Sequence, residues 1–128
     1  MQINVPISIG ELVDKITILE IKSKKIHNNK KLTNINNELD SLNSVLINTQ
    51  INLASLDDYK LELSKVNEEL WNIEDNIRLF EKEKNFSDEF IKLARSVYIT
   101  NDKRFEIKNN INNIFNSDYF EEKSYEEY

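Results

Sequence analysis

An apolar repeat in the middle of the chain limits most strongly what this sequence can fold into. Its seven members are spaced alternately four and three residues apart: Tyr59, Leu63, Val66, Leu70, Ile73, Ile77 and Phe80. On a helix this spacing forms one narrow stripe, as in the seam of a coiled coil. We therefore predict a helix over residues 57–84, capped by Asp57 or Asp58, with its seam buried against another helix.

Three more amphipathic helices are predicted around this one. Ser8 and Glu11 form the pattern of a capping box, which starts a helix at its first turn. The apolar stripe changes phase at 27–31, which indicates either a kink or a short break at Asn28–Asn29 before a second helical stretch. The last helix should span 87–116. Because the loop over 49–56 is short, we expect the second helix to pack antiparallel on the third.

The composition supports a fold made of helices alone. One Gly and one Pro in 128 residues leave little material for tight turns, so long helices and few loops are expected. We predict a single domain over 1–128: an all-α, elongated antiparallel bundle or coiled-coil hairpin of about four helices. An extended N-terminal arm over 1–8 and an acidic aromatic tail over 117–128 complete the chain.

Charge and cysteine content exclude several classes of function. The net charge is −6, so no overall field attracts nucleic acid or an anionic membrane. The chain has no Cys, which rules out disulfides and thiolate metal sites. It has neither a signal-peptide pattern nor a long apolar run, so we expect a cytoplasmic protein.

Arginine is rare in this chain and therefore informative. The sequence has 14 Lys but only three Arg, namely Arg78, Arg95 and Arg104. An arginine in so lysine-rich a chain is expected where its planar fork of N–H donors is needed. Such a fork suits the recognition of a carboxylate or a phosphate.

The last predicted helix carries polar residues within its apolar face. The apolar members of that face are Phe90, Leu93, Ala94, Val97, Phe105, Ile111 and Phe115. Asn101 and Arg104 fall inside it, while Arg95, Tyr98 and Asp102 lie together on another side. Because a buried polar group must be paired, Asn101 and Arg104 indicate one of two arrangements. They form either a satisfied core pair or the wall of a binding site.

Two other helices supply possible partners for Arg104. Glu20 lies on the apolar face of the first helix, either as a long acid reaching the rim of the core or as the partner of Arg104. We predict that Glu20 and Arg104 meet, with Asp102 and Glu74 as competing partners. On the third helix a second stripe holds Asn67, Trp71, Glu74 and Arg78, which is either a solvated ion pair beside a tryptophan or part of a polar pocket. The candidate ligand or partner site is thus Glu20, Trp71, Glu74, Arg78, Arg95, Tyr98, Asn101, Asp102 and Arg104.

Four segments carry a resemblance to known proteins. They are ISIGELVDKITILEIK (7–22), LWNIEDNIR (70–78), FIKLARSVYITNDKR (90–104) and EEKSY (121–125). With these segments the chain resembles a family of small uncharacterised bacterial proteins, all-helical, that form a domain of unknown function. The resemblance implies that the four segments act as one unit, and it supplies no catalytic residues.

Two functions follow as hypotheses. The first is a non-enzymatic binding or assembly module without a cofactor, which binds an anionic small molecule or a protein. A homodimer is favoured, because the helix at 9–26 has apolar residues on two sides. The alternative is a Mg²⁺-dependent enzyme that resembles the all-helical nucleotide pyrophosphatases. Its metal ligands would be Glu11, Asp14, Glu74 and Asp75, although the E-E-x-x-E motif of those enzymes is missing.

Overall fold

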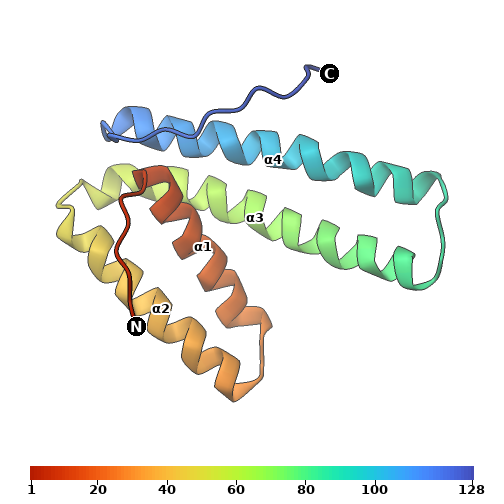
Figure 1. Cartoon of the computed structure of the whole chain (residues 1–128), viewed down its shortest axis with the longest axis horizontal. Coiled ribbons are helices and arrows are strands. Elements are labelled where there is room, and N and C mark those ends of the chain that lie inside the picture. Colours follow the sequence, from red (N-terminus) through yellow and green to blue (C-terminus); the bar gives the residue numbers. More distant parts are fainter.

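The computed structural model describes all 128 residues and contains four helices and no strand. They are α1 (Ile9–Lys25), α2 (Asn29–Asn48), α3 (Leu53–Lys82) and α4 (Asp88–Ile114), shown in Figure 1. The predicted all-α bundle of about four helices is confirmed. No helix combines the length and the apolar character needed to cross a membrane.

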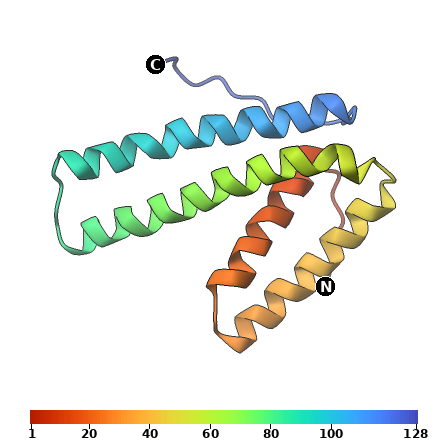
Figure 2. The same ribbon diagram turned by 180° about the vertical axis from the view of Figure 1, so that it is seen from behind.

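The helices form two hairpins of unequal length. α3 and α4 make the longer one, and α1 and α2 make a shorter one that lies across one end of it (Figures 1 and 2). α1 packs against all three other helices, whereas α2 packs against α1 alone. The prediction that α2 packs on α3 is therefore wrong. The α3 seam is occupied by α4 and α1, which leaves α2 the remaining apolar side of α1.

Side-chain caps define most of the helix starts. Ser8 Oγ accepts a hydrogen bond from the Glu11 amide at 3.0 Å, as the capping box predicts. Asn28 caps α2, which confirms the break in the 27–31 region. The start of α3 was predicted wrongly: Asn52, and not Asp57 or Asp58, accepts the capping bond from the Ser55 amide, so α3 begins four residues earlier than predicted. Residues 1–8 form no strand.

The core lies where α1 crosses the α3–α4 hairpin. Its buried apolar members are Leu12, Val13, Ile16, Leu46, Leu56, Leu63, Val66, Ile107 and Ile111. The predicted α3 seam contributes Leu63, Val66 and Ile73 as buried residues, but Leu70 and Ile77 remain only half-buried. Beyond this crossing the chain has no fully buried residue from 74 to 99. We call residues 74–99, which form the free end of the long hairpin, the distal hairpin.

Candidate functional site

A buried carboxylate on α1 connects three helices. The side chain of Asp14 is only 1% exposed, and its Oδ1 accepts a hydrogen bond from Arg104 Nε on α4 at 3.0 Å. Arg104 Nη2 donates a second bond to Oδ2, so the arginine grips the carboxylate along one edge. From α3, Asn67 Nδ2 donates to the same Oδ1 at 2.9 Å. This network joins α1, α3 and α4 at one point.

The surrounding side chains complete the network without leaving a charge unpaired. Asn67 Nδ2 also lies 2.9 Å from Thr17 Oγ1, and that hydroxyl donates to the Asp14 backbone carbonyl at 2.8 Å. The hydrogen bond with Asp14 raises the pKa of Arg104 further above its ordinary value, although partial burial opposes this. Arg104 is therefore always positively charged, and its two hydrogen bonds to Asp14 hold its guanidinium in one orientation.

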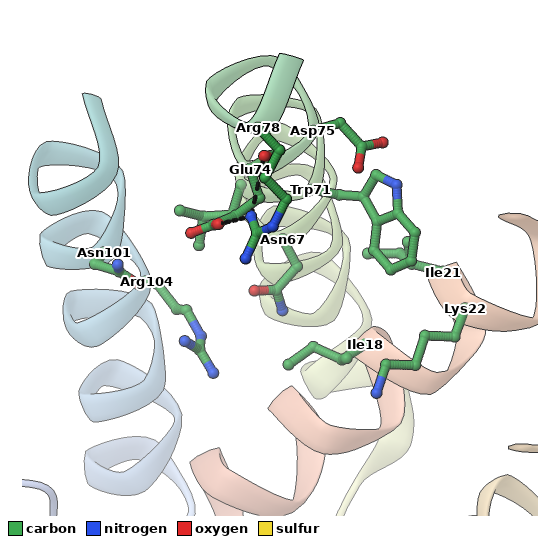
Figure 3. Close-up of a pocket in the computed structure, with 11 residues that line it drawn as sticks. Ile18, Ile21, Lys22, Asn67, Trp71, Glu74, Asp75, Arg78, Asn101 and Arg104 are labelled. Carbon is green, nitrogen blue, oxygen red and sulfur yellow. Dashed lines mark hydrogen bonds and ion pairs between the residues drawn. The ribbon is translucent and has the colours of Figure 1, made fainter. Parts of the chain in front are cut away.

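A groove of about 530 Å³ opens beside this network, between α1, α3 and α4. Its apolar wall consists of Ile18, Ile21, Leu70 and Trp71. Its polar residues are Lys22, Asn67, Glu74, Asp75, Arg78, Asn101 and Arg104. Figure 3 shows the Arg104 guanidinium pointing from α4 into the space toward α3 and α1. The groove therefore combines a flat aromatic and aliphatic wall with converging cationic groups.

Arg104 has donors left over for a ligand. A guanidinium carries five N–H donors, and Asp14 takes one on Nε and one on Nη2. Arg104 makes no other hydrogen bond within the chain, and its side chain is 28% exposed. The Nη1–Nη2 edge is thus available, and that edge matches a carboxylate or phosphate with two parallel bonds.

The charges of the groove favour an anion only locally. Glu74 pairs with Arg78 one turn away on α3, as the sequence indicated, and both side chains are largely solvated. Lys22 makes no ion pair, and it enters the groove from α1 (Figure 3). Lys22 and the free edge of Arg104 are therefore the cationic donors that the chain itself does not use.

The predicted pair of Glu20 and Arg104 does not form. Glu20 accepts from Lys60 Nζ on α3 at 2.9 Å and lies at the rim of the core, a third exposed. The competing partners Asp102 and Glu74 are also wrong for Arg104. Asp14 takes this role because it follows Gly10 by four residues and precedes Thr17 by three, on the face of α1 that packs against α3 and α4.

The other predicted site residues divide between two places. Trp71, Glu74, Arg78 and Asn101 line the groove with Arg104. Tyr98 and Asp102 instead face the tail over 117–128: Tyr128 donates from its hydroxyl to Asp102, and its ring lies 5.1 Å from that of Tyr98. The hydrogen bond to Asp102 raises the pKa of Tyr128 to about 12. Arg95 is exposed and makes no hydrogen bond or ion pair.

The residues of the alternative metal site are already engaged or lie apart. Nowhere in the chain do three or more potential acidic or histidine ligands come together. Both oxygens of Asp14 are held by Arg104, and Glu11 Oε2 lies 2.7 Å from Lys108 Nζ. Glu74 pairs with Arg78 on a different helix. The structure thus gives the Mg²⁺ hypothesis no set of ligands.

Several residues of the network were not among the predicted site residues. Asp14 appeared only as a metal ligand, and Asn67 only as a member of a stripe. The signal was present in the spacing of Gly10, Asp14, Thr17 and Ile21, which places an acid on a stripe of small and apolar residues. All four are buried, as such a stripe implies.

Comparison with known proteins gives the chain a family. The family of unknown function DUF6165 matches residues 3–128. The chain belongs to this family. No curated protein and no solved structure matches it. The DUF6165 match spans nearly the whole chain, so the groove and Arg104 lie within the matched residues.

Proposed function

We propose that this DUF6165 protein is a non-enzymatic binding module whose groove between α1, α3 and α4 takes a small anionic ligand. The observation that supports this most directly is the state of Arg104. One edge of its guanidinium is fixed by the buried Asp14, and the opposite edge faces the groove with no partner in the chain. An arginine fixed in this way loses little conformational freedom when it binds an anion.

The wall of the groove suggests what the rest of the ligand is like. Trp71, Ile18 and Ile21 offer a flat apolar surface beside the cationic donors. A ligand with a planar ring at one end and a carboxylate or phosphate at the other satisfies both parts of the groove. Lys22 would add a second charge-assisted contact from α1. We expect this binding to take place in the cytoplasm, the compartment that the sequence predicts.

The test uses Trp71, the only tryptophan of the chain, as a reporter inside the groove. Phenyl phosphate, benzoate, inorganic phosphate and acetate are titrated at low ionic strength, with tryptophan fluorescence and calorimetry as readouts. We expect the ring-bearing anions to bind more tightly than the bare ones, and comparison of phosphate with carboxylate identifies the anionic group.

Variants assign the binding to the groove. Lys22→Gln removes a cation that has no partner, and Arg104→Lys removes the fork while keeping the charge. Both should weaken binding about tenfold or more, since hydrogen bonds to charged groups contribute roughly 1.5–3 kcal/mol. Arg95→Lys is the matched control, because Arg95 is on the same helix but outside the groove. The proposal is contradicted if none of the four probes binds. It is also contradicted if the Lys22 and Arg104 variants bind the probes as tightly as wild type does.

A further inference from the structure

We propose that the distal hairpin is the surface on which a second copy of the chain packs. This inference is independent of the ligand. In residues 74–99 no side chain is buried, although the segment is rich in large apolar residues. Those residues are Ile77, Leu79, Phe80, Phe86, Phe90, Ile91, Leu93, Val97, Tyr98 and Ile99. At the tip, the rings of Phe86 and Phe90 pack edge to face, with centroids 5.2 Å apart, and Phe86 remains exposed.

The arrangement of α4 shows which face lacks a partner. Arg104 and Lys108 on α4 contact Asp14 and Glu11 of α1. Counting back along the same stripe, at steps of three and four residues, leads through Asn101 to the apolar residues Val97, Leu93 and Phe90. One continuous face of α4 therefore contacts α1 in its C-terminal half, whereas Phe90, Leu93 and Val97 in its N-terminal half are only half-buried.

The near end of the molecule shows what covers such a face. There α1 packs against both α3 and α4 (Figure 2). Leu63 and Ile111 are fully buried in this region. α1 reaches only the start of the distal hairpin, where it lines the groove with Glu74 and Arg78, and neither α1 nor α2 reaches its tip (Figure 1). A second distal hairpin, related by a two-fold axis, would provide two helices for the two that are exposed, and the same residues would be covered on both copies.

Charge favours an identical partner over a strongly charged one. The distal hairpin holds six acids and five bases, a net charge of −1, while the other residues together carry −5. Two copies that meet through this segment therefore avoid the repulsion that the rest of the acidic surface would cause. The groove would lie beside the contact, because Glu74 and Arg78 line the groove and belong to the distal hairpin.

The sequence predicted a dimer from a different feature, namely the apolar residues on two sides of the first helix. The two apolar sides of the helix at 9–26 do not need a second copy, because α2 covers one and the α3–α4 hairpin covers the other. Ile21, on the second side, is 6% exposed.

The test measures mass in solution by light scattering and by sedimentation equilibrium, from micromolar to millimolar concentration. We expect wild type to reach twice the monomer mass of 15.2 kDa. Ala94→Glu adds a charge at an exposed position beside Val97 and keeps a good helix former, so the monomer should stay folded. It should raise the dimer dissociation constant about a hundredfold or more, since each charge would be buried without a partner.

Ala54→Glu is the matched control, since Ala54 is the only other alanine, is also exposed, and lies at the opposite end of α3. It should dimerise like wild type. Phe86→Glu, in the loop between α3 and α4, tests the same surface outside a helix. A wild-type protein that stays monomeric at every concentration overturns the proposal and leaves this face to a different partner. A dimer that persists in both Ala94→Glu and Phe86→Glu overturns it as well.

Discussion

Asp14 receives three N–H donors in a place that water hardly reaches. Two come from Arg104 and one from Asn67, and Thr17 bonds the backbone carbonyl of the same residue. The two partners of the ion pair are not equivalent, because Asp14 is 1% exposed and Arg104 is 28% exposed. Removing the charge of Asp14 and removing the charge of Arg104 should therefore lower the free energy of unfolding by different amounts.

Arg104→Met should destabilise the fold more than Asp14→Asn. The first change leaves a charged carboxylate in the core with a single donor, and breaking a buried pair in this way costs about 3–5 kcal/mol. The second leaves an arginine that can turn toward the groove and water. Urea unfolding followed by circular dichroism measures both, and the double variant should lose less than the sum of the two. Equal losses in the two single variants would contradict this asymmetry.

The single glycine of the chain stands at the tightest contact between α1 and α4. The Gly10 amide donates to Asn112 Oδ1 at 2.7 Å, and a Cβ on Gly10 would overlap the Lys108 backbone oxygen. We expect Gly10→Ala to lower the free energy of unfolding by about 1–3 kcal/mol, even though alanine is the better helix former by about 1 kcal/mol. Lys15→Ala, an exposed change on the same helix, should stay within about 0.5 kcal/mol of wild type.

At the scale of the elements, Lys108 on α4 forms ion pairs with both α1 and the tail over 117–128. Its ammonium is buried and lies 2.7 Å from Glu11 Oε2 and 2.9 Å from Glu121 Oε2. Burial lowers the pKa of Lys108, but the hydrogen bonds to Glu11 and Glu121 outweigh this, so the pKa rises above its ordinary value of 10.5. The protonated form is thus favoured by folding. Its contribution to stability is complete below pH 10.5 and is lost as the pH rises through the folded value.

Alkaline pH should therefore separate wild type from Lys108→Met. At neutral pH the variant should be less stable by about 1.5–3 kcal/mol, since it lacks the two ion pairs of the buried ammonium. Above pH 10.5 the difference should shrink, because wild type then loses the same contacts. Lys103→Met, at an exposed site on the same helix, should follow wild type throughout. Urea unfolding across this range gives the comparison, and a difference that does not change with pH would refute it.

The sequence predicted elements better than partners, for a physical reason. Helices follow from local spacing, so the seam from Tyr59 to Phe80 and the Ser8 cap were found directly. The packing of α2 on α1, and the pairing of Arg104 with Asp14 in place of Glu20, depend on which faces meet in space. Asn101, Trp71 and Arg78 line the groove because they share helical stripes with Arg104 and Asn67. Lys108, between Ile107 and Asn109, was missed because a single lysine has no pattern of its own.

At the scale of the whole molecule, the buried residues are concentrated at one end. The crossing of the two hairpins contains the core, while the distal hairpin contributes no buried residue. If two copies meet there, association is linked to folding, because the dimer contains only folded chains, and stability depends on protein concentration.

The melting temperature should therefore rise with concentration, by about 3–5 °C for each tenfold increase. Calorimetry on wild type measures this directly. Ala94→Glu should melt at a temperature that does not depend on concentration, whereas Ala54→Glu should behave like wild type. A wild-type melting temperature that is the same at all concentrations would speak against association through the distal hairpin.

The contact between the two ends of the chain also determines when the fold can form. Gly10 bonds Asn112 across 102 residues, and the Ile9 amide bonds Ser117 Oγ across 108. During synthesis on a ribosome, α1 and α2 can pair early, because they are neighbours in the chain. Asp14, however, has no arginine until residue 104 has emerged, so the growing chain keeps an uncompensated acid on its first helix. The groove consequently forms only late in synthesis, and a nascent chain that stalls before Arg104 has emerged lacks one of its walls.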